Sequence, residues 1–229
     1  MVTAPSNTTT RSTLSHRLVT DEVLDKATQL FADKGYEATS LADIANELGI
    51  SRPALYHYVN NKEELLVQLV EQVSQQLAEV LEQLSSREDI SPTKKLVDAI
   101  SLMVRQRAQH PNQFRILDRS EYLLPEPAGT EHHTAKRKVL RQVASVIESG
   151  INTREFRHVD ARTTALSILG MCNWVAWWVN IDTDIDAIVA TVTDLASTML
   201  VAGDAQPRTV SNQDTVAQIK LLLDRLSFT

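Results

Sequence analysis

Residues 51–62 carry side chains that can contact duplex DNA, and none of them is acidic. An arginine can donate to a guanine edge or a phosphate, while proline and alanine can contact thymine methyl groups in a major groove about 12 Å wide. Serine, tyrosine, histidine and lysine can donate to phosphate oxygens. We predict that these residues, with one serine upstream, contact DNA: Ser40, Ser51, Arg52, Pro53, Ala54, Tyr56, His57, Tyr58 and Lys62. Packing between helices is the alternative for the three aromatic residues.

The elements that position these side chains follow from the apolar residues around them. Before the turn, apolar residues recur at helical spacing: Leu41, Ile44, Ala45 and Leu48. Residues 49–51 then turn the chain at a glycine, and Leu55 and Val59 form the apolar back of the next helix. Two short helices joined by such a turn are typical of a helix-turn-helix. A helical hairpin that does not bind DNA is the alternative.

Helical spacing of apolar residues continues through most of the chain, and no segment alternates with the period of two that a strand shows. Glycine and proline are scarce, with 6 and 7 in the whole chain, which disfavours a fold with many tight turns. We therefore predict an all-α protein, with helices over approximately these ranges: 19–34, 40–48, 51–59, 61–85, 91–110, 114–124, 131–150, 160–180, 183–201 and 214–226.

These helices are expected to form two domains with an additional segment at each end. Residues 1–18 are rich in serine and threonine and are expected to be a disordered arm, either a solvated tail or an arm that reaches DNA. Residues 19–66 are expected to form a three-helix helix-turn-helix DNA-binding domain, and residues 67–202 a helical domain for ligand binding and dimerisation. Residues 203–229 are expected to be a linker and an additional C-terminal helix.

Charge and hydropathy exclude several classes of protein. The net charge of −6 argues against DNA binding along the whole surface, so attraction must come from local placement and helix N-termini. No apolar run reaches the roughly 20 residues of a membrane helix. The N-terminus lacks the apolar core of a signal peptide. We expect a soluble, cytoplasmic protein without a membrane partner.

The segment Ala38–Leu66, ATSLADIANELGISRPALYHYVNNKEELL, closely resembles the DNA-binding region of TetR-family transcriptional regulators. The resemblance implies a homodimer in which each subunit places its third helix in the major groove of a palindromic operator. It also implies phosphate or base contacts from Ser40, Ser51, Arg52, Pro53, Ala54, Tyr56, His57 and Lys62. One departure concerns His57, Tyr58 and Val59, which stand where the family often has Tyr, His and Phe, so the phosphate contact can belong to either of the first two.

Catalytic chemistry is not indicated elsewhere. His132 and His133 are adjacent and point about 100° apart on a helix, which makes them poor co-ligands for a metal. The single cysteine, Cys172, has no base nearby in the sequence and is expected in the core, and a multi-cysteine zinc site is excluded. The charged residues around Asp118 are explained by a solvated face. We expect no enzyme, no metal site and no cofactor.

All three tryptophans of the chain lie between positions 174 and 178, on a predicted helix that contains Gly170. We expect this helix either to form one wall of an apolar ligand cavity or to belong to the core and the dimer interface. The residues expected to contact a ligand are Met103, Phe114, Leu117, Arg119, Tyr122, Met171, Asn173, Trp174 and Trp178. The interface is expected from the same helix and an apolar stripe over residues 185–199.

The sequences FRILDRSEYLLPEP, NTREFR and LGMCNWVAWW resemble TetR-type repressors of lipid or sterol catabolism that respond to acyl-CoA thioesters. In that subgroup an arginine usually stands at the position of Trp177 and a tyrosine at that of Ala176. Recognition of CoA phosphates therefore needs another cation, for which Arg115, Arg119 and Arg141 are candidates, or the ligand lacks CoA.

The resulting hypothesis is a homodimeric repressor that a hydrophobic or acyl-CoA-type effector releases from a palindromic operator. A repressor of drug efflux that senses lipophilic compounds is one alternative, and a DNA organiser without a ligand is another. A helical ligand-binding protein or enzyme with a non-functional DNA-binding head is the alternative from a different class.

Overall fold

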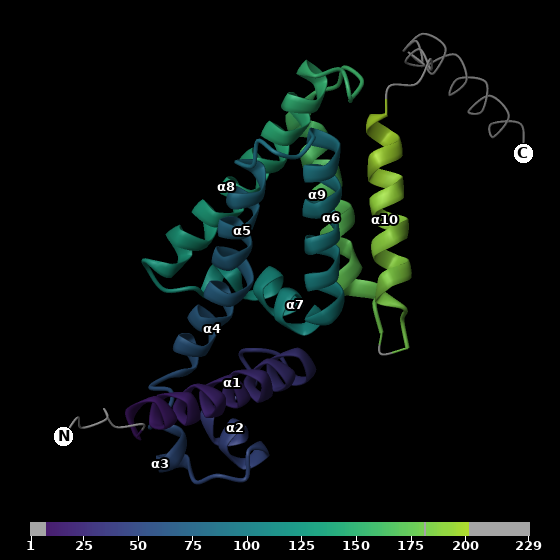
Figure 1. Ribbon diagram of the computed structural model, residues 1–229. Helices are drawn as coiled ribbons and strands as arrows, with labels where there is room; N and C mark the ends of the chain where they lie inside the picture. The colour runs from purple at the N-terminus through teal and green to yellow at the C-terminus, as the bar shows by residue number, and fades with distance from the viewer. Residues whose placement is uncertain (1–7, 181, 202–229) are drawn as a thin grey trace, which may run out of the picture.

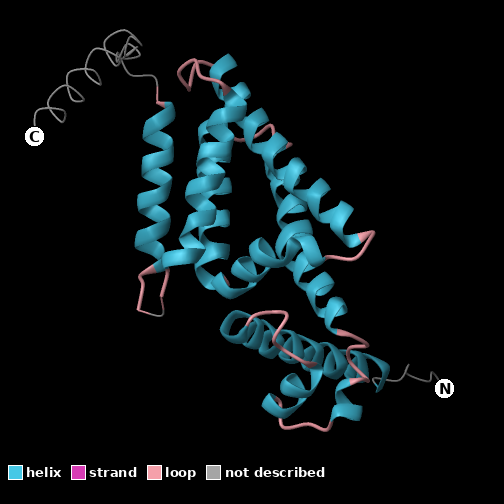
Figure 2. Cartoon of the chain, turned by 180° about the vertical axis from the view of Figure 1, so that it is seen from behind, coloured by secondary structure: helices cyan, strands magenta, loops and turns pink. Residues whose placement is uncertain are grey.

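The computed structural model describes residues 8–180 and 182–201, and within them all regular elements are helical, as predicted. Figure 2 shows helices joined by loops, and Phe156 and Val201 form an isolated β-bridge. The elements are α1 (Thr8–Lys34), α2 (Leu41–Glu47), α3 (Arg52–Leu55), α4 (Lys62–Val70), a π-helical turn (Glu71–Gln75), α5 (Gln76–Ser85), α6 (Pro92–Gln109), α7 (Pro111–Ser120), a 3-10 turn (Glu121–Leu123), α8 (Ala128–Asn152), α9 (Ala161–Trp178) and α10 (Ile185–Leu200).

Helices α1, α2 and α3 form a small head, and α4 leads from the head into the larger helical body (Figure 1). The core of the head is made by α1 to α4 but also includes Ile116 and Leu117 of α7. Leu69 and Val73 belong to the same core. The packing of the head therefore extends beyond residue 66, where we placed the domain boundary.

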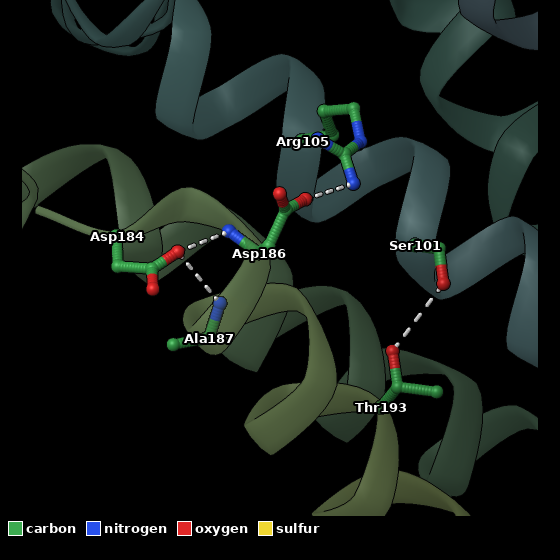
Figure 3. A network of polar contacts seen from close by, with 6 residues as sticks. All are labelled: Ser101, Arg105, Asp184, Asp186, Ala187 and Thr193. Carbon is green, nitrogen blue, oxygen red and sulfur yellow. Dashed lines mark hydrogen bonds and ion pairs between the residues drawn. The ribbon is translucent and has the colours of Figure 1, made fainter.

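The body has its own core, to which α5, α6, α8, α9 and α10 all contribute. Helix α10 packs on α6 at one flank of the body (Figure 1). Polar contacts support this packing: Arg105 donates to Asp186 Oδ1 at 2.6 Å, and the hydroxyls of Ser101 and Thr193 lie 3.4 Å apart (Figure 3). Asp184 caps α10 by accepting from the backbone N–H of Ala187 at 3.1 Å.

Helix α7 lies at the end of the body that faces α1 of the head (Figure 1). It packs against α1 and α4 of the head and against α6 and α9 of the body. Helix α7 is therefore part of the packing of both the head and the body.

Two expectations about helix limits need correction. The predicted helix over residues 61–85 is interrupted by the π-helical turn Glu71–Gln75, a feature that often marks functional sites. The expected disorder of residues 1–18 is wrong for residues 8–18, because α1 begins at Thr8. These residues contain no glycine or proline, and extending an existing helix costs far less than starting one. The linker and helix expected over 203–229 lie outside the described residues.

Candidate nucleic-acid interface and ligand cavity

The helix-turn-helix begins at Ser40, which forms a capping box with Asp43. Ser40 Oγ donates to Asp43 Oδ2 at 2.6 Å and accepts from the backbone N–H of Asp43 at 3.2 Å. The hydrogen bonds from Ser40 lower the pKa of the Asp43 carboxyl. Ser40 therefore fixes the start of α2. Because Ser40 is also exposed, its predicted phosphate contact stays a proposal.

The turn between α2 and α3 depends on Gly49, whose φ of +68° lies in the left-handed region that favours glycine. Ile50 then donates from its backbone N–H to the carbonyl of Ala45 at 3.0 Å. Ser51 caps α3 by accepting from the backbone N–H of Ala54 at 3.3 Å. Pro53 lies in the first turn of α3, where the backbone needs no N–H donor.

Helix α3 has a buried back and an exposed front. Leu55 and Val59 are buried in the core of the head. The remaining predicted DNA contacts around them are exposed or half-buried: Arg52, Pro53, Ala54, Tyr56, His57 and Tyr58. Tyr58 packs against the core of the head, as its alternative interpretation proposes. The structure thus brings the acid-free residues onto one short helix and the turn after it.

Arg52 and Tyr56 stand one turn apart on this front. The guanidinium of Arg52 donates to the hydroxyl of Tyr56 at 3.4 Å and lies 5.9 Å from the centre of its ring. Both side chains are exposed, so they are accessible to a phosphate or a base edge.

Lys62, at the start of α4, is engaged inside the head. Its ammonium group donates to the carbonyls of Tyr36 at 2.8 Å and Thr39 at 3.0 Å. It also lies 4.3 Å from the centre of the Tyr36 ring. These contacts tie the start of α4 to the loop between α1 and α2. A phosphate contact by Lys62 would have to compete with them.

The body contains a cavity of about 420 Å³ between α5, α6, α7, α8 and α9. Three of the residues predicted to contact a ligand line it: Phe114, Leu117 and Asn173. Gly170 also lines it, and nothing lies within 4 Å of where its Cβ would be. No described residue therefore packs closely against α9 at this glycine.

The other predicted ligand contacts lie outside this cavity. Met103 is fully buried in the core of the body, and Met171 packs against that core. Arg119 and Tyr122 line a second cavity, of about 560 Å³, at the junction of head and body. Trp174 and Trp178 project from α9 into solvent with 64% and 48% of their surfaces exposed. Helical spacing places these tryptophans on one face but does not show that the face is directed outward.

Trp177, unlike the exposed Trp174 and Trp178, lies at the junction of head and body. It lines the second cavity, and the guanidinium of Arg119 lies 4.9 Å from the centre of its ring. Arg115 is also engaged, because its Nε donates to the carbonyl of Ala176 at 2.6 Å. Two of the three arginines suggested for CoA recognition are thus held near α9.

The cavity includes a buried arginine that the sequence interpretation missed. Arg107 lines the cavity from α6, and its Nε donates to Asn173 Oδ1 at 3.2 Å. It stands in register with Ile100, Met103 and Val104, which are fully buried. An arginine on the apolar face of a helix was the signal that could have identified it.

A second polar group in the cavity wall joins the 3-10 turn to α8. Glu121 Oε2 lies 3.0 Å from His132 Nε2 and accepts from Lys136 Nζ at 2.7 Å. Burial lowers the pKa of His132 below its ordinary value, even though the carboxylate of Glu121 opposes that change. His132 is therefore a neutral imidazole at neutral pH.

The family of the chain is established by comparison with known proteins. Residues 23–69 match the family model described as bacterial regulatory proteins, tetR family. Residues 89–200 match the model described as tetracyclin repressor-like, C-terminal domain. The chain belongs to the TetR family of DNA-binding transcriptional regulators.

Two curated relatives illustrate this membership. The chain is 41% identical over 51 residues to the biofilm operon regulator IcaR of Staphylococcus epidermidis, a match that covers 22% of this chain and 28% of IcaR. It is 24% identical over 178 residues to the transcriptional activator FasR of Mycolicibacterium smegmatis, covering 75% of this chain and 78% of FasR.

Solved structures share the fold. The ketosteroid transcriptional regulator KstR2 of Mycobacterium tuberculosis has a TM-score of 0.74 and 20% identity, over 80% of this chain and 95% of that chain. AibR, solved in complex with isovaleryl coenzyme A and operator DNA, has a TM-score of 0.66 and 22% identity, over 77% of this chain and 96% of that chain. Among the described residues, no helix is long and apolar enough to cross a membrane.

Proposed function

We propose that this regulator is a homodimeric repressor that binds a palindromic operator and is released by a small hydrophobic or acyl-CoA-type effector. The observation that carries the proposal is the exposed, acid-free front of α3 on a TetR-family head. Arg52, Tyr56 and His57 are exposed donors on this front. Phosphate contacts by Ser40, Tyr58 and Lys62 are secondary in this proposal, because each has a structural role in the head.

An exposed apolar face on α9 and α10 supports the homodimer. The exposed large apolar residues on these two helices are Leu166, Trp174, Trp178, Leu195 and Met199. Val201, directly after α10, is exposed as well. Apolar patches of this kind mark interaction sites in soluble proteins. The stripe expected over 185–199 contributes less than predicted, because Ile188, Val189 and Ala196 are buried in the core of their own subunit.

The cavity in the body supports an effector. Its volume lies in the range of ligand sites, roughly 300–1,000 Å³, and its walls are largely apolar. AibR, which shares the fold, was solved with isovaleryl coenzyme A. For this chain the acyl part of such a thioester is the part that the cavity can accommodate, while the remainder would have to lie outside it.

Coupling between cavity and head is proposed to run through α7 and the π-helical turn. Leu117 of α7 lines the cavity and is also part of the core of the head. Val73 of the π-helical turn has both roles as well, and its carbonyl accepts from Gln106 Nε2 at 3.3 Å. An effector that fits only one arrangement of these elements shifts the population toward wrongly spaced recognition helices.

The test is operator binding by Arg52→Ala in the full chain. Loss of one base or phosphate contact should weaken binding by about 1–3 kcal/mol. Arg87→Ala is the matched control, because Arg87 is an exposed arginine after α5, outside the head, and should bind like the wild type. If Arg52→Ala and the wild type bind the operator with equal affinity, the proposed recognition surface is wrong.

A further inference from the structure

Arg107 is a buried charge in the wall of the effector cavity. Only 6% of the residue is exposed, and it lies on the apolar face of α6. Taking a charge out of water costs several kcal/mol unless a counter-charge or hydrogen bonds replace the lost solvation. The groups that surround its guanidinium therefore decide what the cavity can bind.

The partners of Arg107 in the structure are neutral. Its Nε donates to Asn173, its Nη1 donates to the side-chain oxygen of Gln106, and its guanidinium lies 4.9 Å from the centre of the Phe114 ring. Cys172 is a neutral thiol, because burial raises its pKa to about 12. Among the side chains that the structure describes, no carboxylate oxygen lies within 4 Å of a guanidinium nitrogen of Arg107.

The guanidinium retains both its charge and free donors. Burial lowers the pKa of Arg107 to about 10, which still leaves it protonated at neutral pH. An arginine has five N–H donors in a fixed fork. Nη2 makes no hydrogen bond to any described residue, although Arg107 lines the cavity. The cavity therefore presents an uncompensated cation with unused donors.

The carboxylates that line the cavity do not serve as counter-charges for Arg107. Glu121 is occupied by His132 and Lys136. Asp118 is exposed and forms no ion pair with Arg107. The other two cations of the lining, Lys136 and Arg137, are exposed at its rim. Arg107 is thus the buried cation of this cavity.

We propose that Arg107 binds a carboxylate of the effector, so that the cavity takes a compact apolar molecule with one acidic end. This inference rests on the proposed function and specifies the chemical class of the effector. A guanidinium fork matches the geometry of a carboxylate and can donate two parallel hydrogen bonds to it. The walls around the remainder of such a molecule are apolar and include Leu77, Phe114 and Leu169.

The size of the cavity and the burial of Arg107 fit a carboxylate on an apolar chain. The volume of about 420 Å³ has room for a medium-length acyl chain. Because Arg107 is 6% exposed, only a slender group can reach its guanidinium without displacing α6 or α9. A terminal carboxylate meets both requirements.

The test is calorimetric titration of the full chain, without DNA, with decanoate and with 1-decanol at neutral pH. The two probes share the alkyl chain and differ at the end that would meet Arg107. Decanoate is expected to bind at least tenfold more tightly than 1-decanol. Equal affinities, or no binding of either probe, would overturn the proposal.

Two variants assign the difference to Arg107. Arg107→Met should lower decanoate affinity at least tenfold while leaving 1-decanol affinity within about twofold. Asn173→Asp, which places a competing carboxylate beside the guanidinium, should have the same effect and serves if the first variant fails to fold. Arg162→Met is the matched control, since Arg162 is an exposed arginine in the first turn of α9 that does not line the cavity, and this variant should retain the preference. Wild-type preference in both Arg107→Met and Asn173→Asp would contradict the assignment.

The readout separates this proposal from the proposed function. Because the titration contains no DNA, decanoate binding can be found even if the chain binds no operator. In that case the inferred site stands and the proposed repressor is wrong. If the chain binds an operator but binds the two probes equally, the proposed function stands and the inferred carboxylate site is wrong.

Discussion

At the level of single residues, Lys62 shows how a cation in a DNA-binding motif can stabilise the head. Its ammonium group donates to the carbonyls of Tyr36 and Thr39 and lies against the Tyr36 ring. Both carbonyls belong to the loop that follows α1, so the contact joins α4 to that loop. We interpret Lys62 first as a structural tie and second as a phosphate contact.

We predict that Lys62→Met lowers the free energy of unfolding by about 1–2 kcal/mol, because charge-assisted hydrogen bonds are lost at a half-buried position. Urea denaturation followed by circular dichroism measures this change. Lys94→Met is the control: it removes an exposed pair with Asp98 and should cost less than about 0.5 kcal/mol. A Lys62→Met protein as stable as wild type but deficient in operator binding would favour the phosphate role.

His132 connects burial to pH. In the folded chain its pKa is lowered by burial, so the imidazole is neutral where the unfolded chain, with an ordinary pKa near 6.5, takes up a proton. The unfolded state then binds more protons than the folded state as pH falls through that value. Linkage therefore requires that the contribution of His132 to the free energy of unfolding decreases as the pH falls.

We predict that His132→Gln loses less thermal stability than wild type when the pH is lowered from 7.5 to 5.5. The change in Tm between these two pH values is the quantity to compare, since it is insensitive to the overall cost of the substitution. An unchanged pH dependence in His132→Gln would show that other groups are responsible.

At the level of elements, two glycines in long helices have different reasons to be present. A Cβ at Gly150 of α8 would lie 2.1 Å from the ring of Phe156, which packs across the end of that helix. Phe156 is buried and donates from its backbone N–H to the Gly150 carbonyl at 3.0 Å. At Gly170 of α9 the corresponding space is open.

We predict that Gly150→Ala destabilises the protein by about 1–3 kcal/mol, because the ring must leave its packed position. Gly170→Ala should instead stabilise it by up to about 1 kcal/mol, the ordinary gain from replacing glycine by alanine within a helix. Chemical denaturation of the two variants side by side gives the comparison. Stabilisation by both substitutions would show that Phe156 yields without cost.

Much of the arrangement of helices could be predicted from the sequence, because helical spacing, caps and glycine stops are local signals. Ser40, Ser51 and Ser91 each cap a helix in the structure. The π-helical turn Glu71–Gln75 was not predictable in this way. Its apolar positions continue the helical pattern, and the irregularity lies in the backbone hydrogen bonding.

The ligand cavity was less predictable for a related reason. Spacing identifies residues that share one face of a helix, but not whether a cavity, the core or solvent lies opposite. Phe114, Leu117 and Asn173 line the cavity, whereas Trp174 and Trp178 are exposed. Arg107 was overlooked because a charged residue among apolar ones is informative only once its burial is known.

At the level of the whole molecule, the exposed apolar face of α9 and α10 is the feature that a second copy can cover. We predict that the wild-type chain is a dimer at micromolar concentration and that Trp174→Glu shifts it toward monomer, because a charge is placed within the apolar face. Sedimentation velocity measures both states. Tyr122→Glu alters an aromatic residue that is 76% exposed elsewhere and should remain dimeric. A wild-type monomer, or a dimeric Trp174→Glu, would contradict this interface.

The central claim is that two copies of the acid-free α3 surface bind one DNA duplex. The most direct measurement is selection of duplexes from a random library by the full chain, followed by sequencing. We predict enrichment of an inverted repeat whose half-sites lie about one helical turn, 10–10.5 base pairs, or a multiple of it apart. The same selection with Arg52→Ala should lose that enrichment. If the wild-type chain enriches no inverted repeat, the claim is wrong.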